Sequence, residues 1–502
     1  MRADGGRSTP LALGGEEFRA LGHRLVDRIA DGLARIPRGP VTRYESPSAL
    51  RAALDLEAGL PEHPAPPGPL IEETARRLFE HSLLNGHPRF FGYITAPPAP
   101  IGILGDLLAA AVNPNVGAWA LSPAATEIEA QTVRWIAEFI GYPIDCGGLL
   151  VSGGNMANFI GFLAGRAAQA PWALRARGVH ADSGTLRVYA STETHTWLQK
   201  AADIAGLGTN AIRWIPTDER QRMDVAALRK QLDADIAAGD LPCIAIGTAG
   251  AVSTGAVDPL TEIADVCRQY RLWFHVDGAY GACAARVAGA PEALRGLSAA
   301  DSVAVDPHKW LYAPLEAGCA LVRNPDALRA AFAYHPPYYH FDEQVTNYLD
   351  YGPQNSRGFR ALKVWLAFRQ AGAAAYREMI GDDITLSRSM AQAVSRQDEL
   401  ELATQELSIA TFRYVPRELR SRTGHPDVEG HLDTLNRELL DRLQRGGDTF
   451  VSNAVVAGRY MLRACIVNFH TQLADVEALV DIVVREGRIT ERDLKATAPE
   501  RI

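Results

Sequence analysis

The sequence predicts an α/β protein built around a mostly parallel sheet, and two observations support this fold class. From about residue 100 onward, short apolar runs alternate with small-residue loops and with helical patterns. The runs are apolar at consecutive positions, which is typical of strands that helices cover on both faces. Such strand segments include LLVSGG, LRVYAS, PCIAIGT, LWFHVD and DSVAVD. With 502 residues, 47% of them hydrophobic, the chain can bury a large core.

The N-terminal part is expected to be helical and to stand apart from the sheet. In residues 15–36 the apolar side chains recur at helical spacing and stop before Pro37: Phe18, Leu21, Leu25, Ile29 and Leu33. A proline-rich connector, LPEHPAPPGP, follows at 60–69. We therefore expect this part to pack as an appendage on the main body or on a partner chain.

The C-terminal part reads as a smaller α+β unit. A long helical stretch runs past residue 390, and ELSIATFRYVP and LRACIVNF read as strands among helices. We expect three parts: an N-terminal helical segment (1–99), a large domain (100–385) and a small C-terminal domain (386–502).

Composition favours small-molecule chemistry in the cytoplasm. The net charge is -8, and no block of basic residues indicates a nucleic-acid or anionic membrane surface. The longest apolar run, 101–112, carries Asp106 and is too short to span a bilayer, and the N-terminus lacks an apolar signal core. Six cysteines occur singly, without C-x-x-C pairs, which indicates reduced thiols and no metal site.

A lysine follows the strand segment in SVAVDPHKWL. Pro307 cannot extend a central ladder, so the chain turns and places Lys309 at the end of the strand. Ligands bind at strand ends in open α/β sheets, and a lysine in a partly dry pocket can become a nucleophile toward carbonyls. On this segment alone, a surface lysine after a turn remains the alternative.

Asp277 ends a second strand, LWFHVD, in an apolar setting where a carboxylate needs a cationic partner. It could also simply cap the following helix. An aspartate and a lysine at two strand ends of one sheet match what pyridoxal phosphate needs. The lysine forms the Schiff base, and the acid keeps the pyridine nitrogen protonated.

Two further segments fit the same site. In VSGGNMANF a strand runs into Gly153 and Gly154, and a helix begins near Asn155, offering N–H groups to a phosphate. In STETHTWLQKA, His195 follows a strand and opens a helix, where it can stack on an aromatic cofactor and bind a carboxylate. Taken alone, the first is equally a structural turn and the second an ordinary helix start.

These motifs together resemble the group II pyridoxal-phosphate-dependent decarboxylases, the family of aromatic-L-amino-acid, histidine and glutamate decarboxylases. The resemblance is carried by HVDGAYG, HKW and THTWLQKA, with HPRFFGYITAPPAP, ALSPAATEIE, SRGFRALKVW and LRACIVNFHT in the family's order. It implies a fold-type I enzyme with a mostly parallel seven-stranded sheet in the large domain, an α+β small domain and a helical N-terminal segment. It also implies a homodimer, in which pocket walls come partly from the neighbouring chain.

The resemblance assigns roles to individual residues. Lys309 matches the Schiff-base lysine, Asp277 the partner of the pyridine nitrogen, and His195 the histidine stacked on the ring. Ala279 matches the small residue on the ring's other face. The remaining matches to cofactor-binding positions are Gly154, Asn155, Asp306 and His308, while Val252 stands where many relatives have a threonine.

The implied reaction is decarboxylation of an L-amino acid to its amine and CO2. In the family a tyrosine on a mobile loop returns the proton, which matches Tyr338 here, although Tyr339 next to it leaves the register open. Related aldehyde synthases carry phenylalanine at that position. An aldehyde synthase or aminotransferase with the same cofactor is the alternative, and a non-catalytic dimeric binding protein is a remote one.

The side chains expected to line the substrate pocket are Phe91, Tyr93 and Trp119, which favour an aromatic or large apolar substrate. The family's aromatic decarboxylases have bulky residues just before the tryptophan. Here Asn115 and Gly117 stand in that run, which indicates a wider or more polar pocket.

Overall fold

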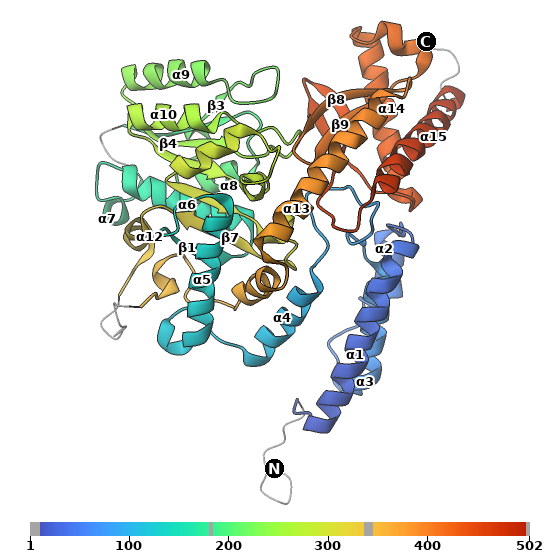
Figure 1. The fold of residues 1–502 in the computed structure, drawn as a ribbon, viewed down its shortest axis with the longest axis horizontal. Coiled ribbons are helices and arrows are strands. Elements are labelled where there is room, and N and C mark those ends of the chain that lie inside the picture. The colour runs from blue at the N-terminus through green and yellow to red at the C-terminus, as the bar shows by residue number, and fades with distance from the viewer. Residues whose placement is uncertain (1–10, 180–183, 336–344, 498–502) are drawn as a thin grey trace, which may run out of the picture.

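The computed structural model describes residues 11–179, 184–335 and 345–497 and contains two sheets surrounded by helices (Figure 1). The larger sheet has seven strands in the order β1-β7-β6-β5-β4-β2-β3. Its strands are β1 (Gly147–Val151), β2 (Leu186–Ser191), β3 (Ile212–Ile215), β4 (Leu241–Thr248), β5 (Trp273–Asp277), β6 (Ser302–Val305) and β7 (Gly318–Val322). Only β7 runs antiparallel to its neighbours, β1 and β6. The mostly parallel seven-stranded sheet is therefore confirmed.

Helices cover both faces of this sheet. The helices between residues 100 and 332 are α4 (Pro100–Val112), α5 (Pro123–Ile140), α6 (Gly154–Gln169), α7 (Leu174–Arg177), α8 (Trp197–Ile204), α9 (Val225–Ala237), α10 (Leu260–Tyr270), α11 (Pro307–Trp310) and α12 (Pro325–Phe332), of which α4 packs against α13 (Ala361–Ser395). Side chains alternate between two cores: Val303 and Val305 of β6 join one cluster, and Ala304 joins the other. Because both faces are buried, the strands read as continuous apolar runs in the sequence.

A second, antiparallel sheet forms the C-terminal part, with strand order β10-β11-β9-β8. Its elements are β8 (Leu400–Glu406), β9 (Ile409–Tyr414), β10 (Ser452–Val456), β11 (Arg459–Cys465), α14 (Pro426–Gly446) and α15 (Leu473–Thr497). The long helix α13 (Ala361–Ser395) connects the two sheets and is interrupted at Gly372, whose φ is 75°. The domain boundary expected at residue 385 falls inside α13, and the division into domains stays a prediction.

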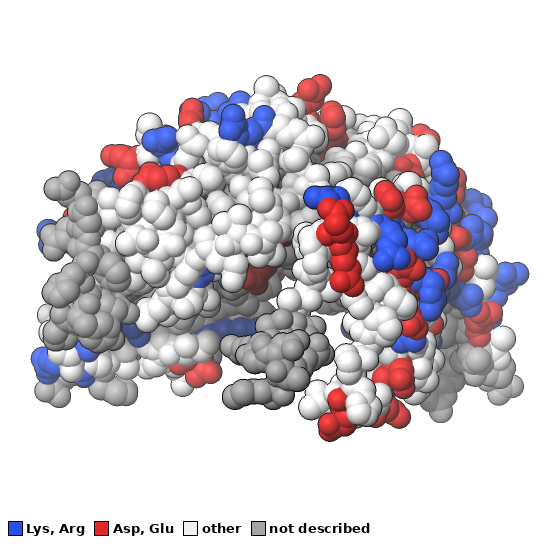
Figure 2. Space-filling model, turned by 90° about the horizontal axis from the view of Figure 1, so that it is seen from below, with Lys and Arg blue, Asp and Glu red and all other residues white. Residues whose placement is uncertain are grey.

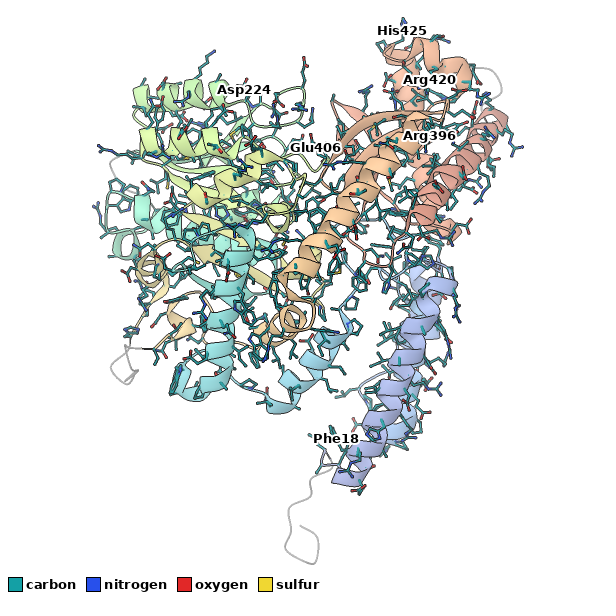
Figure 3. The ribbon with its side chains drawn as sticks, in the orientation of Figure 1. Phe18, Asp224, Arg396, Glu406, Arg420 and His425 are labelled. Carbon is teal, nitrogen blue, oxygen red and sulfur yellow. The ribbon has the colours of Figure 1, made fainter. Side chains whose placement is uncertain are left out.

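The N-terminal helices are α1 (Gly15–Arg35), α2 (Pro47–Ala53) and α3 (Pro67–His81). α1 and α3 pack side by side and project away from the body (Figure 1). Phe18 lies near the free end of α1 and is 61% exposed (Figure 3). Short 3-10 helices occur at η1 (Ile36–Arg38), η2 (Trp119–Leu121), η3 (Thr209–Ala211), η4 (Gly281–Ala284), η5 (Glu292–Ala299), η6 (Tyr348–Asp350) and η7 (Arg417–Arg422). Within the described ranges, no helix combines the length and the apolar character needed to cross a bilayer.

Candidate functional site

The carboxyl ends of β5 and β6 bring two acidic segments together. These strands are parallel neighbours, with Asp277 opposite Ala304. Pro307 is the first residue of α11, because its fixed φ suits a helix start and it needs no donor there. The turn therefore sends Lys309 back over Asp306, and its Nζ lies 3.1 Å from Asp306 Oδ2.

Asp306 is nearly inaccessible, whereas Lys309 reaches the surface of the site. The Asp306 side chain is 2% exposed and that of Lys309 is 21% exposed. Within the described part of the chain, Asp306 Oδ1 is buried without a hydrogen-bond partner. An unpaired buried oxygen is costly, so this edge of the sheet is suited to a further polar group.

Asp277 is held by two neutral donors. The Trp197 indole Nε1 donates to Asp277 Oδ2 at 2.7 Å, and the Ala279 backbone N–H donates to Oδ1 at 3.2 Å. Because these donors carry no charge, they orient the carboxylate without neutralising it.

The N-terminus of α6 meets the same strand ends. A Cβ built at Gly154 would lie 2.5 Å from Asp306 Oδ2 and 3.2 Å from the Ala279 Cβ. Gly153 precedes it with φ at 116°, a conformation that favours glycine. The first N–H groups of a helix have no partner one turn earlier, so the start of α6 at Gly154 and Asn155 offers donors to an anion.

His195 lies just before α8 rather than inside it, since α8 begins at Trp197. Burial lowers the pKa of His195, with Lys309 acting in the same direction and Asp277 opposing it. Its Nδ1 accepts the Trp197 backbone N–H at 3.3 Å. Trp197 donates its backbone N–H to His195 and its indole N–H to Asp277, so the histidine and the aspartate lie in one site.

His308 anchors the turn that carries Lys309 to the segment before β7. Its Nδ1 accepts the Ala317 backbone N–H at 3.1 Å, and burial lowers the pKa of the ring. The contact ties α11 to the segment that enters β7. His308 therefore contacts the scaffold, while Lys309 next to it remains accessible.

The expected pocket residues occupy different environments. Tyr93 is 54% exposed, and its backbone N–H donates to Ser452 Oγ at 2.8 Å. Trp119 is partly exposed, and its backbone N–H donates to Asn347 Oδ1 at 3.0 Å. Phe91 is fully buried in the core of the C-terminal part, so we correct the expectation that it lines the pocket.

The environment of Val252 was not apparent from the sequence. Its carbonyl accepts a hydrogen bond from Arg463 Nη1 at 2.6 Å. Arg463 is buried and also donates to Ser452 Oγ at 3.2 Å. The Arg463 side chain therefore connects β11 to the loop that follows β4. The motif LRACIVNF contains Arg463, but nothing in the motif predicts its contact with Val252.

Sequence reasoning also missed the roles of Trp197 and Asp383. Trp197 lies in the quoted motif THTWLQKA, but nothing there reveals a partner 80 positions away. Asp383 of α13 is buried and accepts hydrogen bonds from Trp310 Nε1 at 2.8 Å and from the Tyr312 hydroxyl at 2.9 Å. A carboxylate beneath the lysine turn could not be assigned from a helical segment alone.

Tyr338 and Tyr339 lie outside the described residues, so the proton donor expected there stays a prediction. Among the residues that the structure does describe, no three His, Cys, Asp or Glu side chains are grouped as metal ligands.

Comparison with known proteins gives a consistent result. Residues 47–415 match the family model described as the pyridoxal-dependent decarboxylase conserved domain. The chain is 32% identical over 489 residues to an aromatic-L-amino-acid decarboxylase of Bacillus atrophaeus, covering 96% of this chain and 98% of the relative. It is 30% identical to a phenylacetaldehyde synthase of a Rosa hybrid cultivar, with 91% of each chain covered.

A solved structure with the same fold is that of Oryza sativa TDC with PLP and tryptamine. It superposes with a TM-score of 0.87 at 28% identity, over 96% of this chain and 99% of that one. Similarity therefore extends over nearly the whole length in both sequence and structure.

The residues gathered at the sheet edge fit pyridoxal phosphate. Lys309 supplies an accessible amine, and Asp277 supplies a carboxylate held by neutral donors. The start of α6 supplies donors beside a space that a Cβ at Gly154 would fill. An amine, an acid and an anion-binding helix start are the three groups that this cofactor requires.

Proposed function

Since the chain belongs to the pyridoxal-dependent decarboxylase family, we propose that it removes CO2 from an aromatic or large apolar L-amino acid. The chain is a pyridoxal-phosphate-dependent amino acid decarboxylase. The substrate class and the residue roles are the proposed part. The observation that carries them is geometric: Asp277 ends β5, Lys309 follows the neighbouring strand β6, and Trp197 bonds to both Asp277 and His195.

When bound, pyridoxal phosphate supplies an electron-accepting ring that allows the bond between Cα and the substrate carboxylate to break. In our proposal Lys309 holds the cofactor through its amine, with Asp306 and His308 fixing the turn that carries it. Asp277 holds the ring nitrogen and keeps it protonated. Gly154 and Asn155 bind the phosphate, and Ala279 leaves room for the ring.

His195 is suited to orient the substrate. Burial lowers its pKa, so the ring is neutral at pH 7. Its Nδ1 accepts the Trp197 N–H, so the proton of the neutral ring lies on Nε2. We propose that this Nε2–H donates to the substrate carboxylate before CO2 leaves.

The return of a proton to Cα decides between decarboxylation and oxidation. We assign this step to Tyr338, with Tyr339 as the alternative in register. Decarboxylases and phenylacetaldehyde synthases are both about 30% identical to this chain, so the products of a variant at this tyrosine distinguish the two reactions. Tyr338→Phe is expected to retain the cofactor and, with dissolved dioxygen as the two-electron oxidant, to shift products from amine toward aldehyde, ammonia and peroxide. An unchanged amine yield would contradict the role.

An aromatic or large apolar substrate is supported by Tyr93 and Trp119, and by the names of the relatives. Near Trp119, Asn115 Oδ1 accepts the backbone N–H groups of Arg357 and Gly117, so its side chain is occupied within the turn. A Cβ at Gly117 would lie 2.1 Å from the Asn355 carbonyl oxygen. This stretch therefore presents little bulk to a substrate, which favours a roomy pocket.

The test measures cofactor uptake and products in the same preparation. The purified protein is reconstituted with pyridoxal phosphate, its visible absorption is recorded, and a panel of L-amino acids is added while CO2 and amine are quantified. We expect equal amounts of CO2 and amine from aromatic substrates, loss of the visible band in Lys309→Ala, and no change in the exposed control Lys230→Ala. Ketoacid would indicate an aminotransferase, and aldehyde, ammonia and peroxide an aldehyde synthase. Failure to bind the cofactor would indicate a binding protein.

We also propose a homodimer. Helix α4 leaves apolar side chains about half exposed or more: Leu104, Leu107, Leu108 and Val112. Figure 2 views the molecule from the side where α4 lies in Figure 1 and shows a broad surface with few charged side chains. The projecting pair α1 and α3 leaves further apolar surface uncovered, including Phe18 (Figure 3). Exposed apolar patches of this kind are typical of interfaces, and a second copy of this chain is the proposed occupant.

Sedimentation tests the dimer. We expect Leu108→Glu to weaken association, whereas Ile204→Glu, at a 71% exposed position on α8, leaves it unchanged. A wild-type monomer with full activity would contradict the proposal. A cytoplasmic location also remains a proposal, supported by six cysteines that are all free thiols and testable by cell fractionation.

A further inference from the structure

One tryptophan bonds to two residues of the proposed cofactor site. The Trp197 indole Nε1 donates to Asp277 Oδ2 at 2.7 Å, and its backbone N–H donates to His195 Nδ1 at 3.3 Å. The side chain is 2% exposed, so water does not compete for the indole N–H. We propose that Trp197 is a positioning residue that sets the orientation of the Asp277 carboxylate and of the His195 ring.

The indole itself is fixed by its surroundings. Its ring packs edge-on against His275 at 5.6 Å and Phe162 at 6.4 Å between centroids. His275 is locked in turn, with Nδ1 2.7 Å from Ser302 Oγ and Nε2 2.8 Å from Asn158 Oδ1. Because His275 and Phe162 hold the Trp197 indole in place, its N–H group cannot move with the Asp277 carboxylate. The hydrogen bond therefore favours one orientation of that carboxylate.

The choice of donor matters for the charge at the site. An arginine or lysine at this position would pair with Asp277 and reduce its attraction for another cation. The neutral indole occupies Oδ2 and leaves the negative charge available. Among the described residues, Oδ1 accepts one hydrogen bond, from the Ala279 backbone N–H at 3.2 Å, so we assign Oδ1 to the cofactor's ring nitrogen.

This inference rests on the proposed role of Asp277 toward the cofactor ring, and the test separates the two. Dissociation constants are measured by fluorescence titration for pyridoxal phosphate and for its 1-deaza analogue, which has carbon in place of the ring nitrogen. The ratio of the two constants reports how much the ring nitrogen contributes to cofactor binding. The measurement does not depend on catalytic activity.

We expect Trp197→Phe to raise the dissociation constant of pyridoxal phosphate about 10-fold, since a hydrogen bond to the Asp277 carboxylate is lost. The dissociation constant of the analogue should stay nearly unchanged. The matched control is Trp365→Phe on α13, which deletes an indole N–H that donates to a neutral side chain, Gln131 Oε1, at 2.7 Å and that shares no bond with the Ser302–His275 pair. The control is expected to lose similar stability while its ratio stays at the wild-type value.

Three results would overturn the inference. If Asp277→Ala leaves the ratio unchanged, Asp277 does not hold the ring nitrogen, and the proposed role fails together with the inference. If Asp277→Ala changes the ratio and Trp197→Phe does not, only the positioning role of Trp197 fails. An equal change in Trp365→Phe would show a general effect of losing an indole N–H.

A second variant covers the case in which Trp197→Phe does not fold. Replacing Trp197 by 3-benzothienylalanine keeps the ring shape and substitutes sulfur for the N–H group. The same selective loss for pyridoxal phosphate is expected. A wild-type ratio in this protein would contradict the proposal.

Discussion

A methyl group added at Gly154 is expected to lower both the stability of the fold and the affinity for pyridoxal phosphate. In Gly154→Ala the Cβ would lie 2.5 Å from Asp306 Oδ2 and 3.2 Å from the Ala279 Cβ. Ordinary contact needs roughly 3.5 Å or more, so about 1 Å of overlap must be relieved. Asp306 cannot retreat easily, because it is buried and its Oδ2 lies 3.1 Å from Lys309 Nζ.

Overpacking of this kind lowers the free energy of unfolding by about 1–3 kcal/mol. The clash also displaces residues of the proposed phosphate site and Lys309, so cofactor affinity should fall. Urea unfolding and a pyridoxal phosphate titration measure the two effects separately. The control is Gly430→Ala inside α14, where no atom lies within 4 Å, and alanine there is expected to stabilise by up to about 1 kcal/mol.

A double-mutant cycle identifies the cause. If the clash with the carboxylate is responsible, adding Asp306→Ala to Gly154→Ala costs less than the two single changes predict. Strict additivity, or a Gly154→Ala protein with wild-type stability and cofactor affinity, would refute this reasoning.

Two further predictions concern buried charges. Arg357→Met should cost about 3–5 kcal/mol because it leaves Glu129 charged at 0% exposure, and adding Glu129→Gln should recover part of the loss in denaturant unfolding. Burial raises the pKa of Asp383 to about 7, so the folded state favours the neutral acid, and its contribution to stability is lost as pH rises from about 4 to 7. Asp383→Asn should therefore gain stability relative to wild type across this range, by at most about 4 kcal/mol, and a pH-independent difference would contradict the assignment.

The fold could be predicted because its signals are local. Strands β5 and β6 are covered on both faces and read as short apolar runs, and Pro307 marks the turn that ends β6 and begins α11. The sequence predicted Asp277 and Lys309 at two strand ends of one sheet, and the structure adds that the two strands, β5 and β6, are neighbours.

Other features depend on contacts between distant segments and leave no local signal. Phe91 lies within the segment HPRFFGYITAPPAP and was expected to line the pocket, yet its backbone bonds to Phe450 and Cys465 of the C-terminal part, and its ring is buried there. The contact of Arg463 with the Val252 carbonyl spans 211 positions. Periodicity and turn chemistry describe neighbours in sequence, so neither partner could be inferred from them.

The two carboxylates at the sheet edge differ in the charge of their partners, and this difference explains their separate roles in the proposed mechanism. Asp306 lies 3.1 Å from the Lys309 amine, which offsets its charge and fixes the amine. Asp277 accepts from the Trp197 indole and from a backbone N–H, and no lysine or arginine in the described part of the chain forms an ion pair with it. A buried carboxylate whose donors are all neutral favours a cation nearby. The edge therefore presents one neutralised carboxylate beside the amine and one uncompensated carboxylate, which is the arrangement that a protonated ring nitrogen requires.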